Sequence, residues 1–481
     1  QVRFPSPMDT PAPIATLTGL TAAFECVRAA SRADPFPSLA VRRRRLDALA
    51  ALVHDRRDDI AAAIAQDFGH RPARESLLLE VFPTLEALRH ARRHLPGWMR
   101  PRHTRVSPWF LPARAEIRYQ PLGCVGIIAP WNYPLFLAAA PLASVFAAGN
   151  RALVKLSEYT PATADLLAAL VPRYFAPDEF AVVGGDAELA KAFAALPFDH
   201  LLFTGSTGVG RQVMATAAAN LTPVTLELGG KSPALVAPDY PLTRAAERIV
   251  LGKGLNAGQT CIAPDYVLLP SGSEESFLAA ARRTAIAAWP DFAHCPDVAA
   301  TANERHFQRL LAYLDDARTA GARIEPLLPE ARPDPATRRF PPIALLDVPA
   351  SCRVMHEEIF GPLLPLVPYA DVDQALAWVQ GRERPLAFYL FDENPARTES
   401  ILNATVAGGV TVNDTLLHIA QDSLPFGGVG ASGMGQIHGH AGFLTFAKEM
   451  SVFRQSRTNG MGLLKPPYGK TFDALLRLLV R

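Results

Sequence analysis

The chain has 481 residues, of which 49% are hydrophobic and 20% are charged, and its formal net charge is +2. This length exceeds what one hydrophobic core usually supports and predicts two or three domains. The apolar content excludes an intrinsically disordered chain, and the near-zero net charge gives no reason to expect a nucleic-acid partner. No apolar run approaches the roughly 20 residues of a membrane span, and no signal-peptide pattern opens the sequence.

The five cysteines are odd in number, scattered and without CxxC spacing. This pattern argues against a disulfide framework and against a zinc site, and no His/Cys/Asp cluster has the spacing of metal ligands. We therefore expect a cytoplasmic protein without a bound metal. A lone cysteine is by default a buried structural thiol, which is the interpretation for Cys26, Cys124, Cys295 and Cys352.

The N-terminal quarter divides into an arm, a helical region and a bridging segment. Residues 1–15 contain four prolines and are expected to form a flexible arm. Residues 40–95 have helical periodicity that ends near Pro96, and the arginines from Arg42 to Arg45 precede an apolar stripe. We interpret these arginines as a solvated helix face. Residues 105–121 suit an edge or bridging strand.

Short apolar runs alternate with helical ones from residue 123 onward. Strands are predicted at 124–129, 152–156, 180–183, 200–204 and 224–228, and helices at 134–148, 160–174, 187–196 and 209–219. Such βαβ alternation predicts a parallel sheet in an α/β fold. Thr160 before Pro161 is the expected helix cap. The alternation resumes after residue 230, with helices at 274–288 and 371–379, and predicts a second α/β domain.

A glycine-rich turn follows one of the predicted strands and opens a helix. In Phe203-Thr-Gly-Ser-Thr-Gly-Val-Gly210, exposed amides and the helix dipole could hold a pyrophosphate. The turn departs from GxGxxG, and by itself it could equally be an ordinary tight turn.

Cys261 ends a run of small and polar residues, Asn256-Ala-Gly-Gln-Thr-Cys261. This setting gives a substrate access to sulfur, as a nucleophile requires. The thiolate also needs a lowered pKa or a neighbouring base, which the sequence does not reveal. A structural role remains the alternative.

Two further polar residues occupy positions that suit catalysis. Glu227 lies within the apolar strand Val224-Thr-Leu-Glu-Leu228, where burial would raise its pKa and make it a base. The alternatives are a carboxylate facing solvent or paired with Lys231. Asn132 lies in the turn Pro130-Trp-Asn-Tyr-Pro134, where its amide could donate to an oxyanion or serve only the turn.

Six motifs occur in an order that resembles the aldehyde dehydrogenase superfamily. Besides the segments already described they include Leu226-Glu-Leu-Gly-Gly-Lys-Ser-Pro233, Glu357-Glu-Ile-Phe-Gly-Pro362 and Pro425-Phe-Gly-Gly428. The resemblance covers nearly the whole chain after the arm. Cys261-Ile-Ala-Pro-Asp-Tyr266 and the glycines from 427 to 435 are similar to the class 3 branch. Phe198-Asp-His-Leu-Leu-Phe-Thr204 and Asn413-Asp-Thr-Leu-Leu-His418 resemble bacterial coniferyl-aldehyde dehydrogenases.

The resemblance implies a role for each matching residue. Cys261 becomes the nucleophile, Glu227 the general base, and Asn132 with the Cys261 backbone N–H the oxyanion hole. For NAD, the resemblance implies that Lys155 and Glu158 contact the adenosine ribose. Gly205 and Ser206 would lie by the pyrophosphate, and Glu358 and Phe360 would hold the nicotinamide ribose and ring. NADP is a possible second cofactor. Leu156 stands where the family often has proline, which affects local stiffness more than these contacts.

The expected architecture is a Rossmann-like cofactor domain, an α/β catalytic domain and a small β bridging element. We place the cofactor domain at 16–104 and 122–228, the catalytic domain at 229–430, and the bridging and C-terminal segment at 105–121 and 431–481. A strand near 448–456 should join the bridging element and support a homodimer.

The expected reaction is oxidation of an aldehyde, aromatic or conjugated, through a cysteine thioester. The alternatives are a medium-chain aliphatic aldehyde, an acylating enzyme that uses coenzyme A, and a thiol hydrolase without redox chemistry.

Overall fold

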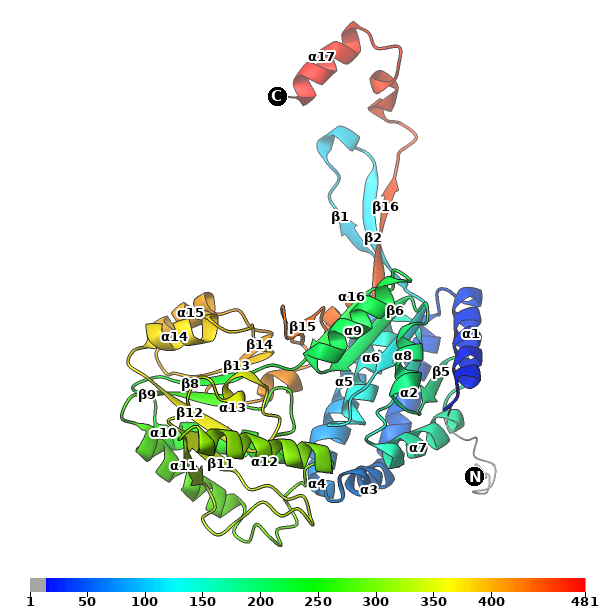
Figure 1. Cartoon of the computed structure of the whole chain (residues 1–481). Helices are drawn as coiled ribbons and strands as arrows, with labels where there is room; N and C mark the ends of the chain where they lie inside the picture. Colours follow the sequence, from blue (N-terminus) through cyan, green and yellow to red (C-terminus); the bar gives the residue numbers. More distant parts are fainter. Residues whose placement is uncertain (1–13, 481) are drawn as a thin grey trace.

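The computed structural model describes residues 14–480, so the predicted arm lies almost entirely outside the described residues. At its described end, Ile14 forms an isolated parallel bridge with Val183. Figure 1 shows two α/β bodies side by side and a narrow sheet that projects from them.

The first body contains a six-stranded sheet of order β15-β7-β6-β3-β4-β5. Five strands are parallel, and only β15 is antiparallel to its neighbour β7. The parallel strands follow the order 3-2-1-4-5 of a Rossmann half, with the switch point between β3 and β6. The five predicted strands are confirmed, with bounds β3 Cys124–Ile128, β4 Arg151–Lys155, β5 Phe180–Val183, β6 His200–Gly205 and β7 Val224–Leu228. The short strand β15 Gly433–Met434 was not predicted.

Helices cover both faces of this sheet because its strands are apolar on both sides. Cys124 and Ile128 of β3 belong to one buried cluster, whereas Val125 and Ile127 belong to another, as the two-residue period of a strand requires. The first cluster contains side chains of α1 Leu17–Ala33, α8 Ala187–Ala194 and α9 Thr207–Ala218. The second contains side chains of α2 Leu39–Asp55, α3 Arg57–Phe68, α5 Phe82–Trp98, α6 Phe136–Ala148 and α7 Pro161–Leu170.

The second body contains a seven-stranded sheet of order β10-β11-β12-β9-β8-β13-β14. Only β10 is antiparallel to its neighbour. Its strands are β8 Pro233–Val236, β9 Tyr266–Pro270, β10 Arg323–Pro326, β11 Ile343–Leu346, β12 Leu363–Tyr369, β13 Ala387–Phe391 and β14 Gly409–Val412. The helices are α10 Leu242–Gly254, α11 Glu274–Ala288, α12 Glu304–Thr319, α13 Arg353–His356, α14 Val372–Gln380 and α15 Pro395–Ala404.

The projecting sheet consists of three antiparallel strands, β1 Arg102–Thr104, β2 Arg114–Pro121 and β16 Ala447–Arg454. It begins three residues earlier than the expected bridging segment. The segment after residue 430 is also less uniform than expected, because β15 pairs with β7 and α16 (Gly439–Thr445) packs on α5 and α6. Helix α17 (Lys470–Leu479) lies at the far end of the projection (Figure 1).

Short helical turns complete the chain. They are α4 Ala73–Ser76, the π-helix η2 Leu77–Val81, and the 3-10 turns η3 Pro108–Phe110, η4 Val171–Arg173, η5 Leu255–Gly258, η6 Leu417–Ala420 and η7 Gly460–Leu464. Within residues 14–480, no helix combines the length and the apolarity needed to cross a membrane.

Two of the four arginines in the run of α2 are buried, so only part of it is the solvated face that was predicted; Arg44 is exposed. Arg42 is fully buried and donates to the carbonyls of Ala147 and Ala148 at the end of α6, at 3.0 and 2.8 Å. Arg45 is 1% exposed and bonds Glu179 at 3.1 Å. Helix C-termini leave carbonyls without partners, and a guanidinium with five N–H donors can satisfy several of them.

Two smaller predictions are also corrected. Helix α7 begins at Pro161 as expected, but Thr160 does not cap it; the Asp67 carboxylate of α3 accepts the first amides instead. The prediction that the helical region ends near Pro96 is confirmed, since α5 ends at Trp98 with Pro96 in its last turn. Cys26 is exposed rather than buried.

Candidate active site

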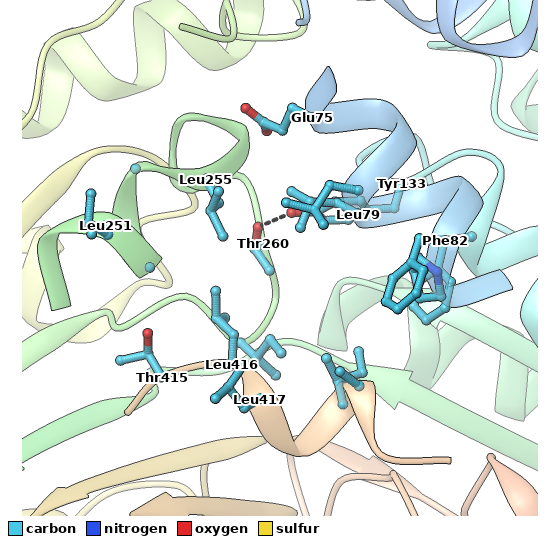
Figure 2. Close-up of a pocket in the computed structure, with 18 of the residues that line it drawn as sticks. Glu75, Leu79, Phe82, Tyr133, Leu251, Leu255, Thr260, Thr415, Leu416 and Leu417 are labelled. Carbon is cyan, nitrogen blue, oxygen red and sulfur yellow. Dashed lines mark hydrogen bonds between the residues drawn. The ribbon is translucent and has the colours of Figure 1, made fainter. Parts of the chain in front are cut away.

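A cavity of about 750 Å³ opens between the two bodies, and Cys261 contributes to its wall. This volume is within the usual range for small-molecule sites. The lining is mainly apolar, and Figure 2 shows residues of α5, α10 and the loop after β14 around it. Near Cys261 the hydroxyls of Tyr133 and Thr260 form a hydrogen bond of 2.6 Å, which joins two walls of the cavity.

The loop before Cys261 has an unusual backbone. Asn256 and Ala257 have φ values of 51° and 52°, in the left-handed region that side chains disfavour, and Gly258 follows with φ of 74°. A Cβ atom at Gly258 would lie 2.4 Å from the carbonyl oxygen of Gly361, so glycine alone permits this approach. The Cys261 loop is thereby packed against the loop that contains Glu358.

Gln259 fixes the same loop through its buried side-chain amide. Its Nε2 donates to the carbonyls of Asn256 and Ala300 at 2.9 and 3.1 Å, and its Oε1 accepts from the Ala302 amide at 2.9 Å. These bonds span more than forty residues of sequence, from 259 to 302. They hold the position of Cys261 independently of its own contacts.

In the described part of the chain, the charged groups that act on the Cys261 thiol are the carboxylates of Glu358 and Glu227, and no cation lies among them. Burial, together with the Glu358 and Glu227 carboxylates, raises the pKa of Cys261 to about 12. Backbone N–H groups of Cys261 and Ile262 oppose this shift by stabilising the thiolate. The resting thiol is therefore protonated at neutral pH.

Glu227 is buried at the end of β7, where its backbone pairs with Thr204 of β6 and Gly433 of β15. Neither of its carboxyl oxygens has a hydrogen-bond partner among the described residues. Burial raises the pKa of Glu227 well above its ordinary value. It does not face solvent, and Lys231 pairs with Asp265 instead.

Asn132 is 3% exposed and lies against the Cys261 loop. Its Nδ2 donates to the Gln259 carbonyl at 3.1 Å, and its backbone oxygen accepts from Asn256 Nδ2 at 3.0 Å. An asparagine amide nitrogen carries two hydrogens, so a second donor remains for a ligand.

The residues expected to bind the adenosine and pyrophosphate lie at the carboxyl edge of the first sheet. Lys155 ends β4 and is 1% exposed, and its Nζ donates to the Leu156 and Gly185 carbonyls at 2.7 and 2.9 Å. Burial lowers the pKa of Lys155, and the charges of the exposed Glu158 and of Asp186 offset part of this shift. Gly205 ends β6, and Ser206 is the N-cap of the twelve-residue helix α9, without a side-chain capping bond.

Glu358 and Phe360 lie on the loop that leads into β12, close to the end of β7. A Cβ atom at Gly229 would lie 2.1 Å from Glu358 Oε2, and the Glu358 Oε1 atom is buried without a partner among the described residues. Burial, with the charge of Asp265, raises the pKa of Glu358 to about 8. Phe360 has φ of 48°, and its ring lies 5.4 Å from that of Trp131.

The polar groups at this edge of the first sheet and on the Glu358 loop therefore fit a dinucleotide. A free helix N-terminus at the Rossmann switch point suits a pyrophosphate, and the unpartnered Glu358 oxygen suits a ribose hydroxyl. Among residues 14–480, no group of three or more His, Cys, Asp or Glu side chains is arranged to hold a metal ion.

Sequence reasoning missed the charged residues that support the site. Arg71, Glu75 and Glu80 are within a helical stretch, where charged residues ordinarily face solvent, yet Arg71 and Glu80 are buried and Glu75 lines the cavity. No local pattern distinguishes them from exposed helix residues.

The pH dependence of Cys261 alkylation follows from its environment. Because its pKa is about 12, the thiolate fraction at neutral pH is small and grows with pH. In a Cys26→Ser variant without cofactor, the rate of iodoacetamide labelling at Cys261 should rise about tenfold per unit between about pH 7 and 9. Mass spectrometry of the labelled peptide gives this rate, and a plateau within that range would contradict the assignment.

Comparison with known proteins agrees with the fold. The sequence profile described as "Aldehyde dehydrogenase family" matches residues 10–452. A Pseudomonas aeruginosa relative named "Probable coniferyl aldehyde dehydrogenase" is 50% identical over 463 residues, which are 96% of each chain.

Solved structures are similar over nearly the whole chain. The substrate-bound state of Staphylococcus aureus AldH is 35% identical with a TM-score of 0.90, over 96% of this chain and 99% of that one. Mycobacterium tuberculosis aldehyde dehydrogenase complexed with NAD+ is 28% identical with a TM-score of 0.81, over 92% and 91%. The chain therefore belongs to the aldehyde dehydrogenase family, as an oxidoreductase that oxidises aldehydes with a nicotinamide cofactor.

Proposed function

We propose that Cys261 is the nucleophile, Glu227 the general base, and Asn132 with the Cys261 backbone N–H the oxyanion hole. One observation carries this proposal: a thiol at the wall of an apolar cavity lies within the electrostatic reach of a buried carboxylate that has no hydrogen-bond partner among the described residues. A buried carboxyl with a raised pKa is suited to take a proton near neutral pH.

The proposed reaction begins when the Cys261 sulfur attacks the aldehyde carbon. A C–S bond forms, the carbonyl electron pair moves to oxygen, and the thiol proton passes to Glu227 or to solvent. The Asn132 amide and the Cys261 N–H stabilise the oxyanion. A nicotinamide held by Glu358 and Phe360 would accept the hydride from the adduct carbon, and the adduct on Cys261 would then be a thioester. Glu227, after releasing to solvent any proton taken from the thiol, then takes a proton from the attacking water. The C–S bond breaks, its electron pair returns to the Cys261 sulfur, and the carboxylic acid leaves.

We propose cofactor contacts that follow the geometry of the two sheet edges. Lys155 and Glu158 would hold the adenosine ribose, Gly205 and Ser206 the pyrophosphate, and Glu358 with Phe360 the nicotinamide ribose and ring. The exposed carboxylate of Glu158 supports NAD over NADP, because it can accept from a ribose diol but would repel a 2′-phosphate.

The proposed substrate is an aromatic or conjugated aldehyde similar to coniferaldehyde. Four aromatic side chains line the cavity, and flat rings pack favourably against them. The name of the Pseudomonas aeruginosa relative supports the same class. Aliphatic side chains such as Leu79, Leu251 and Leu416 also line the cavity, so a medium-chain aliphatic aldehyde is the alternative. The aromatic lining residues are Phe82, Tyr133, Phe136 and Trp289.

We also propose the division of labour among the three parts of the chain. The first body would bind the cofactor, the second would carry the nucleophile, and the projecting sheet would form a homodimer. The exposed strand β1 and the exposed Phe453 of β16 support contact with a second copy, which a light-scattering mass near twice 51.9 kDa would test.

We also propose a cytoplasmic location. Five free cysteines suit a reducing cytoplasm, and the oxidation state of the thiols in the isolated protein would test this.

Glu227→Gln separates the two halves of the reaction. Glutamine has the same shape but cannot take a proton from water, so the variant should form one equivalent of reduced cofactor and then stall as acyl-enzyme. Mass spectrometry should show one acyl group that disappears when Cys261→Ala is added. If Glu227 also deprotonates Cys261, the burst itself should slow. Wild-type turnover would remove Glu227 from the mechanism, and turnover that requires coenzyme A would indicate the acylating alternative.

The aldehyde class can be ranked by kcat/KM. Coniferaldehyde and benzaldehyde should exceed hexanal and octanal, because the aromatic wall favours rings. Phe82→Leu keeps an apolar surface but removes one ring, and it should lower kcat/KM for coniferaldehyde while leaving that for hexanal nearly unchanged. A clear preference for the aliphatic aldehydes in the wild type would overturn the aromatic assignment.

The cofactor preference depends on one carboxylate. NAD should have the higher kcat/KM. Glu158→Gln should raise the ratio of kcat/KM for NADP to kcat/KM for NAD by about tenfold, equivalent to ~1.4 kcal/mol of repulsion. Absorbance of the reduced cofactor measures both. Equal kcat/KM values in the wild type, or no change in the variant, would argue against a close Glu158 contact.

A further inference from the structure

An ion pair lies entirely inside the protein beside the oxyanion-hole loop. Arg71 and Glu80 have fully buried side chains, and Arg71 Nη1 donates to Glu80 Oε1 at 2.7 Å. The free energy lost when two charges are removed from water cancels most of their mutual attraction, so a buried ion pair contributes little net stability. Their contacts to other groups are therefore the more informative feature.

Arg71 contacts the residue assigned to the oxyanion hole. Its Nη1 also donates to the backbone oxygen of Asn132 at 3.2 Å. The guanidinium lies over the ring of Tyr133, with 4.8 Å from its carbon to the ring centroid. The adjacent residues Asn132 and Tyr133 are thus both held by one side chain.

Glu80 holds the same loop from its other end. Its Oε2 accepts from the amides of Leu135 and Phe136 at 2.7 and 3.1 Å. These amides lie at the start of α6, where helix N–H groups have no partner within the helix and favour a negative charge. The Asn132 turn is therefore fixed at Asn132 by Arg71 and at the helix start by Glu80.

Glu75 extends the network to the nucleophile loop. Its Oε1 accepts from the Asn256 amide at 2.5 Å, and Asn256 Nδ2 donates to the Asn132 backbone oxygen at 3.0 Å. Asn132 Nδ2 in turn donates to Gln259 at 3.1 Å. The short segment 71–80 thus contacts both loops that would supply oxyanion donors.

The π-helix Leu77–Val81 explains how one segment serves two surfaces. Its wider turn leaves Leu78 60% exposed and Glu80 0% exposed, while Leu78 and Leu79 line the substrate cavity. π-turns within helices often occur at functional sites.

We propose that Arg71 and Glu80 are positioning residues that set the orientation of the Asn132 amide toward the developing oxyanion. This inference rests on the proposed role of Asn132. Neither residue touches the substrate in this assignment; each acts through the backbone of residues 132–136.

The test compares two buried arginines, of which Arg71 contacts the turn before α6 and Arg42 contacts the end of α6. Arg71→Met should slow single-turnover formation of reduced cofactor by about 10- to 100-fold, because displacing a catalytic donor by about 1 Å has effects of this size. KM and the rate of Cys261 alkylation should change little. Arg42→Met is the matched control, since Arg42 is equally buried but contacts the carbonyls of Ala147 and Ala148. It should lower the Tm without a comparable loss of rate.

A double-mutant cycle with Asn132→Ala separates positioning from general damage. If Arg71 acts through Asn132, Arg71→Met should lower the single-turnover rate by less than about threefold when Asn132 is already alanine. An equal loss in both backgrounds would overturn the positioning role of Arg71. A wild-type rate for Asn132→Ala alone would instead overturn the oxyanion role on which the inference rests.

A second variant avoids leaving a buried charge without its partner. Arg71→Met combined with Glu80→Gln removes both charges, and the glutamine carbonyl can still accept from Leu135 and Phe136. It should fold, as judged by its Tm, and show the same loss of single-turnover rate. A folded double variant with the wild-type rate would refute the proposal.

Discussion

Removal from water is the constraint on which this site depends. Cys261, Glu227 and Glu358 are three acids in one region of low dielectric, and their negative charges oppose one another. Burial raises the pKa of each because a buried anion loses hydration; the carboxylates of Glu358 and Glu227 add to the shift of Cys261, and that of Asp265 adds to the shift of Glu358. The site can hold and transfer protons because its acids are not all ionised at neutral pH. An exposed site of the same composition would lose this property.

Buried polar side chains determine where the two loops of the site lie. Helix α6 is held at its start by Glu80 and at its end by Arg42, so both ends of this apolar helix have partners for their free backbone groups. The Asn132 turn directly precedes α6, so the position of the helix start also fixes the position of the turn. Because an unpaired polar group inside a protein is costly, these contacts also restrict movement of the turn.

Backbone strain near Cys261 is supported by the packing of one loop on another. Asn256, Ala257 and Phe360 all have positive φ values, and the approach of Gly258 to Gly361 brings their loops together. Such conformations cost about 1–3 kcal/mol each and persist only where surrounding contacts determine them. Here those contacts include the amide of Gln259. The nucleophile is consequently placed by residues far from it in sequence.

The order of strands and helices between residues 124 and 228 was predictable from the sequence alone, because side-chain periods of 2 and 3.6 residues are local properties of the backbone. The motifs around Asn132, Glu227 and Cys261 were also recognisable by residue type and order. Tertiary structure decided that Arg42 is buried, that Asp67 rather than Thr160 caps α7, and that the oxygens of Glu227 have no partner among the described residues. It also formed the cavity, whose walls come from segments far apart in the chain. Burial and long-range hydrogen bonds depend on which segments meet, and no local pattern of residues specifies that meeting.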